Sequence, residues 1–146
     1  MKMRSTNRGE RFLLVMVLSF FCLEFGACAR RIAFQTSTVE PAAIGKVIIK
    51  KDRNNNYSME VDVMHLGSPK RLTPAKDVYV VWVETPDNNY KNVGRITTGT
   101  TMFSKALTGS LTTVLLYQPR KVFITAEPEG ELGHPGEPVV LTTEAF

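Results

Sequence analysis

The residues best suited to chemistry in this chain are three carboxylates and one imidazole in a stretch rich in glycine and proline. They are Glu127, Glu129, Glu131 and His134. Carboxylate oxygens and imidazole nitrogens bind divalent metal ions, and a turn-rich loop could bring such groups together. Their spacing fits no metal-binding motif, and the chain has only one other histidine, His65. We therefore expect no metal site, and we interpret Glu129, Glu131 and His134 as a charged, solvated candidate binding loop.

Three tyrosines form a second candidate site. Tyr57, Tyr90 and Tyr117 lie at the starts of predicted strands or beside turns. Exposed aromatic rings stack on sugars, but half-exposed tyrosine is also common in β-sheets. A small-ligand or glycan-binding module is therefore the alternative hypothesis for this chain. It requires the three rings to line one concave surface.

The common catalytic motifs are missing from the sequence. It contains no GxSxG, no HExxH, no P-loop and no Rossmann glycine pattern. No pair of carboxylates stands out for acid–base catalysis. We expect a protein that is not an enzyme and that carries no cofactor.

Cys28 is the residue for which the sequence suggests a covalent modification. It follows a short apolar segment, residues 12–23, which has four basic residues before it and Glu24 directly after it. A membrane-spanning helix needs about 20 apolar residues, and a carboxylate at bilayer depth is costly. The order of basic, apolar and small residues is typical of a bacterial export signal. We therefore interpret residues 1–27 as a signal peptide.

Two cleavage patterns fit this segment. Residues 25–28 (FGAC) resemble a lipoprotein box, in which the cysteine receives diacylglycerol, whereas residues 27–29 (ACA) satisfy the rule of ordinary signal peptidase. We favour the first pattern. A lipid on Cys28 would anchor the protein to a membrane of the cell envelope, facing the periplasm or the cell exterior, with Arg30 and Arg31 near the headgroups. The second pattern predicts a soluble periplasmic or secreted protein.

The charge of the exported part is nearly balanced. The chain has 18 basic and 14 acidic residues, of which the predicted signal peptide holds four and two, so that 14 basic and 12 acidic residues remain. The densest basic cluster is Lys50, Lys51 and Arg53. Against this background we interpret it as solvated loop and strand edge, and we expect no nucleic-acid partner. Cys22 leaves with the signal peptide, so no disulfide is expected.

The exported part divides into a tether and one domain. Residues 28–43 hold the lipidated cysteine and a stretch without sustained periodicity, which we interpret as a flexible tether. Residues 44–146 have the length of one domain and show apolar residues at alternate positions, with turn residues between the alternating segments. The predicted strands are residues 45–51, 57–65, 77–84, 90–97, 111–116, 121–127 and 139–142. About seven short strands predict an all-β fold, an Ig-like antiparallel β-sandwich.

Part of this domain has a more specific pattern. A strand YVVWV, a polar turn and a glycine strand are followed by FITAEPEG and by PGEPVVL. This combination resembles the extracytoplasmic domain of anti-sigma-K factors. The resemblance covers about residues 78–141. The matching positions are Tyr79, Trp82, Gly94, Thr125, Glu127, Pro128, Gly130, Pro135, Gly136, Pro138 and Val139.

The resemblance implies a fold and not sigma-factor inhibition, because only eleven residues precede the apolar segment, too few for a sigma-binding domain. We expect no direct binding of a sigma factor. The resemblance places Glu127 at a strand end, where we expect it to accept backbone hydrogen bonds that fix the following loop. Trp82, with Val78 and Val80 on its face of the strand, and Tyr79 are the expected core aromatics.

The sequence thus predicts a non-catalytic envelope lipoprotein whose β-sandwich is an interaction or sensing module. The expected partner is another envelope protein, bound through a sheet face, a strand edge or the loop 129–138.

Overall fold

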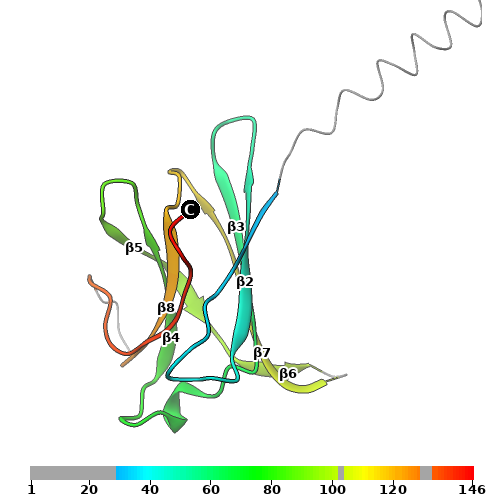
Figure 1. Cartoon of the computed structure of the whole chain (residues 1–146), viewed down its shortest axis with the longest axis vertical. Coiled ribbons are helices and arrows are strands. Elements are labelled where there is room, and N and C mark those ends of the chain that lie inside the picture. Colours follow the sequence, from blue (N-terminus) through cyan, green and yellow to red (C-terminus); the bar gives the residue numbers. More distant parts are fainter. Residues whose placement is uncertain (1–28, 102–103, 129–132) are drawn as a thin grey trace, which may run out of the picture.

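The computed structural model describes residues 29–101, 104–128 and 133–146. Within these ranges the chain forms two packed antiparallel β-sheets and no α-helix (Figure 1). The predicted all-β antiparallel sandwich is therefore confirmed. Among the same residues, no helix is long and apolar enough to span a membrane. The predicted signal peptide, residues 1–27, and Cys28 lie outside the described residues.

Nine strands and one short 3-10 turn make up the described part of the chain. The strands are β1 (Arg30–Ala33), β2 (Ile44–Lys51), β3 (Tyr57–Met64), β4 (Val78–Glu84), β5 (Tyr90–Ile96), β6 (Gly99–Thr101), β7 (Ser104–Leu115), β8 (Lys121–Glu127) and β9 (Val139–Thr142). The turn, η1 (Pro69–Arg71), lies between β3 and β4. The seven predicted strands are all present, and β1 and β6 are additional. Strand β7 also begins earlier than expected.

The strand order is that of an immunoglobulin-like domain. One sheet has the order β1-β2-β3-β7-β6 and the other the order β5-β4-β8-β9. Without β1 at its edge, the five-stranded sheet has the A-B-E-D order of immunoglobulin domains, and the four-stranded sheet has the C′-C-F-G order.

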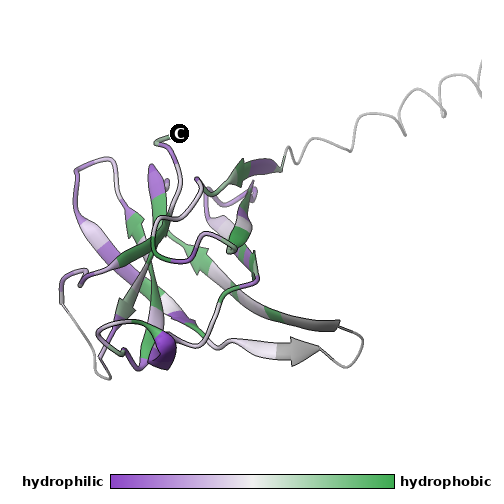
Figure 2. Cartoon of the chain, turned by 60° about the horizontal axis from the view of Figure 1, so that its bottom comes forward, coloured by the Kyte–Doolittle hydropathy of each residue, from purple (hydrophilic) through white to green (hydrophobic). Residues whose placement is uncertain are grey.

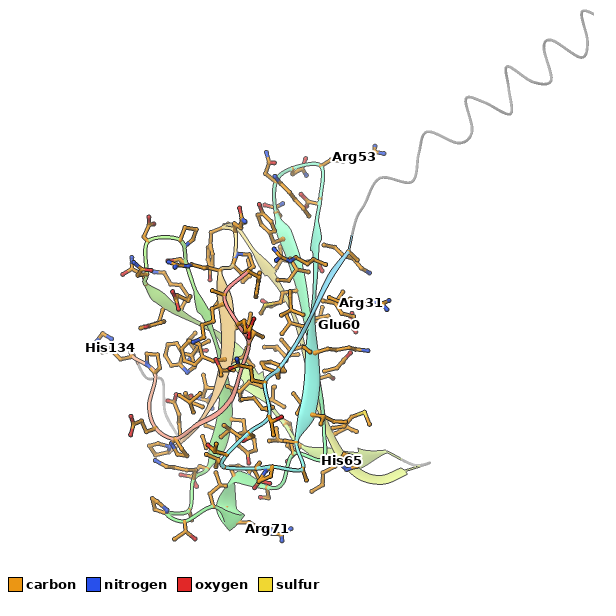
Figure 3. All side chains as sticks on the ribbon, in the orientation of Figure 1. Arg31, Arg53, Glu60, His65, Arg71 and His134 are labelled. Carbon is orange, nitrogen blue, oxygen red and sulfur yellow. The ribbon has the colours of Figure 1, made fainter. Side chains whose placement is uncertain are left out.

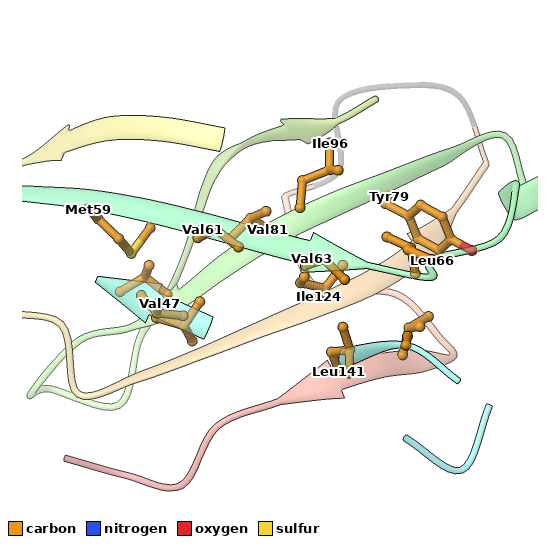
Figure 4. Close-up of a cluster of buried hydrophobic side chains, with 14 of the residues drawn as sticks. Val47, Met59, Val61, Val63, Leu66, Tyr79, Val81, Ile96, Ile124 and Leu141 are labelled. Carbon is orange, nitrogen blue, oxygen red and sulfur yellow. The ribbon is translucent and has the colours of Figure 1, made fainter. Parts of the chain in front are cut away.

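The main core lies between the two sheets and follows from strict alternation along the strands. In β3, Met59, Val61 and Val63 are at most 1% exposed. They face Tyr79, Val81 and Val83 of β4 and Val122, Ile124 and Ala126 of β8 (Figure 4). Each fully buried aliphatic side chain of this kind contributes about 1.5–3 kcal/mol. Polar residues occupy turns at the ends of the strands, as in η1 (Figure 2).

Strand β4 is buried on both of its faces. Trp82 is 1% exposed, so it is buried as expected, but it does not lie between the sheets. It forms a separate cluster with Val80 and Phe123 on the outer face of the four-stranded sheet, with Val78 packed against them. Alternation explains the correction. Tyr79 and Val81 point into the sandwich, so the even-numbered residues of β4 must point out of it.

The predicted tether is part of the fold, which corrects the expected boundary at residue 44. Ile32 faces Val47 in the β1–β2 pair and packs on the main core. Further along, Gln35 N donates to Thr142 O (2.8 Å), and the hydroxyl of buried Ser37 donates to Val140 O (2.5 Å). Residues 30–43 therefore run from the five-stranded sheet to β9 and close one side of the sandwich. The segment Arg30–Ala33 is short and charged, and it forms a strand only because it pairs with β2.

A bulge shapes the opposite side of the sandwich. The register of β4 and β5 shifts by one residue, which leaves Val93 without a partner position, and Gly94 has a φ of 146°. A Cβ at Gly94 would lie 2.9 Å from Leu111 Cδ1 of β7. Only glycine fits this close approach and this backbone conformation. The bulge directs the end of β5 toward the five-stranded sheet.

Candidate binding surface

Three of the six exposed large apolar side chains of the described residues lie on the outer face of the five-stranded sheet. The pairs Ile44–Met64 and Ser58–Val114 lie on this face, because the residues beside them point into the core. Ile44 is 57% exposed, Met64 46% and Val114 62%. Leu116, just after β7, is 82% exposed. Ser58 and Met64 are six residues apart along β3, about 20 Å, so Val114 lies at one end of this face and the pair Ile44–Met64 at the other. Exposed apolar side chains on one face of a sheet mark a candidate interaction surface.

A depression of about 770 Å³ occupies one end of this face. Its lining comes from β2, β3 and β7 and from the segment that runs from the end of β5 to the start of β6. It consists of Ile44, Gly45, Lys46, Asp62, Val63, Met64, Arg95, Thr97, Gly99, Thr108, Gly109 and Ser110. Gly109 allows the close packing below it, because a Cβ there would collide with Ile96 Cγ2. The depression therefore depends on small residues at fixed positions.

The depression mixes charge, hydroxyl and apolar surface. Lys46 Nζ lies 3.8 Å from Asp62 Oδ2 across the β2–β3 pair. Both side chains are exposed, so this pair contributes at most about 1 kcal/mol to stability and can exchange partners readily. Thr97, Thr108 and Ser110 add hydroxyls. Such a surface can bind a ligand or a protein segment that has both apolar and polar groups.

The three candidate tyrosines do not line one concave surface. Tyr57 and Tyr117 are half-buried and pack against the main core. Lys51 Nζ lies 5.6 Å from the Tyr57 ring centroid, and burial raises the pKa of Tyr117 above its ordinary value. Tyr90 is 49% exposed and meets Phe123 edge-on, on the outer face of the other sheet. None of the three lines the 770 Å³ depression.

The predicted acidic loop is only partly described. Glu129 and Glu131 lie outside the described residues, and His134 is exposed on the side of the four-stranded sheet (Figure 3). In the described ranges, no group of three or more His, Cys, Asp and Glu side chains could hold a metal ion.

Glu127 connects this loop to the sheet. The carboxylate is fully buried, and its Oε1 accepts hydrogen bonds from Trp82 Nε1 (2.9 Å), from Gly136 N (3.1 Å) and from the hydroxyl of Thr125. Trp82 Nε1 also lies 2.9 Å from Thr125 Oγ1. The backbone bond from Gly136 is of the kind that the sequence analysis expected for Glu127. The arrangement is structural, since it fixes residue 136 over the outer cluster of Trp82.

Sequence reasoning did not identify Thr125 as part of this network. The pairs Val80–Thr125 and Val78–Glu127 place its hydroxyl and the carboxylate on the face that carries Trp82. The signal that could have revealed it is the Thr-x-Glu spacing, which puts two polar groups on one face of a strand whose other residues are apolar.

Tyr79 lies in the main core, where the sequence placed it. Its side chain is fully buried, and no described group bonds its hydroxyl. Burial, together with the negative charge of Glu40, raises the pKa of Tyr79 to about 12. The phenol therefore stays neutral at physiological pH.

Comparisons with known proteins add no relative. No protein-family model matches the chain, and neither the curated proteins nor the solved structures contain a match to it. The resemblance to anti-sigma-K factors stays a prediction.

Proposed function

We propose that this chain is an interaction module of a bacterial cell envelope, which binds another envelope protein across the outer face of its five-stranded sheet. The observation that supports this most is the exposure of Ile44, Met64 and Val114 on that one face. Burying such side chains against a partner is favourable by about 25 cal/mol per Å² of apolar surface. Binding, and not catalysis, is the activity that this surface supports.

A protein is the partner that suits this face best. The apolar side chains alternate with charged and hydroxyl groups, among them Glu60, Asp62 and Lys46, so the surface combines apolar anchors with polar contacts. Protein interfaces have this composition. The strand edges offer less, because β1 and β9 have four residues each, β6 has three, and the longer edge strand β5 is interrupted by the bulge at Gly94. Residues after β1 also bond to β9.

The location forms part of the proposal. Residues 1–28 have the order of an export signal with a lipoprotein box, and a lipid on Cys28 would hold the module at a membrane. Mass spectrometry of the mature N-terminus tests this directly. Acyl mass on Cys28 supports the anchor, whereas a free N-terminus at Arg30 contradicts it and makes the protein soluble in the periplasm or secreted.

Charge placed on the outer face tests the interaction. The doubly substituted variant Ile44→Asp, Met64→Asp and the control variant Val139→Asp would be purified from gently crosslinked, detergent-solubilised membranes. Val139 is 43% exposed but belongs to the other sheet. We expect a discrete complex with the native protein and with the control, and none with the double variant. The same complex with all three proteins, or no complex with any, contradicts the proposal.

A small ligand in the depression is the second candidate function. Its 770 Å³ fall within the range of about 300–1,000 Å³ that is usual for ligand pockets. Ser110→Trp would fill this exposed position with a large side chain. Native mass spectrometry of the purified protein should then show a bound non-protein mass that the variant loses. Absence of such a mass from the native protein counts against this candidate.

A further inference from the structure

Five exposed basic residues gather at the end of the five-stranded sheet where β1 begins and where β2 turns into β3. They are Arg30, Arg31, Lys50, Lys51 and Arg53. The β1–β2 register places Arg30 opposite Ile49 and Arg31 opposite Ile48, so the start of one strand lies beside the end of the other. Figure 3 shows Arg53 at the tip of the β2–β3 turn, Arg31 lower on the same sheet beside Glu60, and Arg71 at the opposite end of the molecule.

Basic residues outnumber acidic residues at this end. The acidic residue in the same turn is Asp52, whose carboxylate accepts hydrogen bonds from Asn54 N (2.8 Å) and Asn56 N (2.8 Å). These bonds, chiefly the one from Asn56, hold the pKa of Asp52 below its ordinary value. A second carboxylate, Glu60, lies opposite Ile48, which also pairs with Arg31. Two carboxylates against five basic side chains leave an excess of three positive charges.

This excess is larger than that of the whole exported part. Residues 28–146 contain 14 basic and 12 acidic residues, and removing this end, with Asp52 and Glu60, leaves nine basic and ten acidic residues. The neighbouring loops of the other sheet are nearly balanced, with Lys91, Arg120 and Lys121 against Glu84 and Asp87. The positive charge of the exported part is therefore concentrated at one end of one sheet.

Two of the basic groups are held in place by contacts with aromatic rings. The Arg30 guanidinium lies 5.1 Å from the Phe146 ring centroid, and Lys51 Nζ lies 5.6 Å from that of Tyr57. Stacking on a ring face orients a cation, and the ring carries no negative charge to neutralise it. The cluster thus presents a partly ordered set of positive charges to solvent.

From this concentration of charge we infer that this end of the domain, defined by Arg30, Arg31, Lys50, Lys51 and Arg53, is a membrane-contact surface that binds the anionic headgroups of a lipid bilayer. The chain's own course favours a bilayer over other anions. Strand β1 begins only two residues after Cys28, so the lipid of the proposed anchor would hold this end, and no other, against the headgroups. This orientation rests on the proposed function, whereas the charge of the surface does not.

The orientation has a consequence for the binding surface. The eight residues of β2 run from the depression at Ile44 to the basic end at Lys51, a length of about 26 Å at 3.3 Å per residue. A bilayer at the basic end leaves the depression and the apolar pair Ile44–Met64 facing away from the membrane. The module would then present its candidate interaction surface to a partner at a fixed height.

The test uses unlipidated protein, residues 29–146, which contain all nine described strands and both apolar clusters. Flotation with phosphatidylcholine vesicles is compared with flotation with vesicles that contain about 30% phosphatidylglycerol. We expect binding to the anionic vesicles alone and its loss in about 0.5 M NaCl, because salt screens these charges. Equal binding to both vesicles, or no binding to either, would overturn the inference.

Matched charge removals locate the surface. The variant Arg31→Gln, Lys50→Gln should lower the partition into anionic vesicles about 25-fold, at roughly fivefold per basic residue. The control Lys70→Gln, Arg71→Gln removes the same charge at the opposite end and should lower it by less than about twofold. Equal losses would overturn the inference, as would tighter binding to a DNA duplex than to the vesicles. Because no lipid anchor is present, a failure here is distinguishable from a missing acyl group on Cys28.

Discussion

Glu127 gathers three hydrogen-bond donors on one carboxylate oxygen in a place closed to solvent. Each donor is itself buried or half-buried, so removing the carboxylate leaves Trp82, Thr125 and Gly136 without this acceptor. A buried donor without an acceptor costs about 1–3 kcal/mol.

We expect Glu127→Ala to lower the free energy of unfolding by about 3 kcal/mol. Urea unfolding followed by tryptophan emission measures this well, because Trp82 is the single tryptophan of the chain. Its emission should also shift to longer wavelength in the folded variant as the covering loop loosens. Glu137→Ala, which removes an exposed carboxylate nearby, serves as the control. Equal stability of the Glu127 variant and the native protein would contradict the structural role.

The raised pKa of Tyr79 predicts that the free energy of unfolding falls at high pH. Its pKa rises from 10.0 to about 12 in the folded protein, so above pH 10 the folded state holds a proton that the unfolded state has lost. The stability that comes from this proton is complete below pH 10 and is lost as the pH rises through about 12. The loss is on the order of 2–3 kcal/mol, and Tyr117 adds to it in the same direction.

Tyr79→Phe should remove most of this alkaline loss. Its stability at pH 7 should stay within about 1 kcal/mol of the native value, because the deleted hydroxyl has no partner among the described groups. Urea unfolding at a series of pH values from 8 upward to about 12 gives both results. An unchanged pH dependence in the variant would show that Tyr79 is not the group responsible.

At the scale of elements, the bulge in β5 requires glycine at position 94, and a single substitution tests this requirement. Gly94→Ala should destabilise the domain by about 2–3 kcal/mol, because the positive φ is strained for alanine and the new methyl group meets Leu111. Thermal unfolding provides the measurement. Gly99→Ala is the matched control, since a Cβ there meets nothing within 4 Å. Similar effects of the two substitutions would contradict the bulge geometry.

Several elements could be predicted from sequence because their pattern is local. The alternation of Met59, Val61 and Val63 predicts an amphipathic strand, and this prediction does not depend on which strands lie beside it. The break at Gly94 likewise indicates a bulge or a close contact. Strand β1 could not be recognised in this way, because the segment Arg30–Ala33 is short and charged and becomes a strand only through its pairing with β2.

The face of Trp82 illustrates a second limit. Strand β4 is apolar on both sides, so period-two alternation cannot tell which side faces the other sheet. The depression could not be predicted from sequence. It is lined by residues 44–46, 62–64, 95–99 and 108–110, which meet only in the folded chain, and glycines shape the space between them. The acidic loop was a candidate binding site because it contains carboxylates and a histidine. Its described part instead packs around Glu127, with Gly136 N donating to the carboxylate.

At the scale of the whole molecule, the two ends of the five-stranded sheet have different characters. One end concentrates basic side chains beside the start of β1, and the other end carries the depression beside Ile44 and Met64. A module fixed at its basic end and bound to a partner on the sheet face would use both features at once. The four-stranded sheet, with its outer cluster covered by the residues around Gly136, supplies rigidity.

The interaction face can be tested residue by residue in the cells that produce the protein. A photoreactive amino acid replaces Met64, on the outer face of the five-stranded sheet, or Tyr90, on the outer face of the other sheet; the two positions are 46% and 49% exposed. If the five-stranded sheet binds an envelope protein, irradiation yields one discrete adduct from position 64 and none from position 90. Adducts from position 90 alone, or the same adducts from both positions, would contradict the proposed binding face.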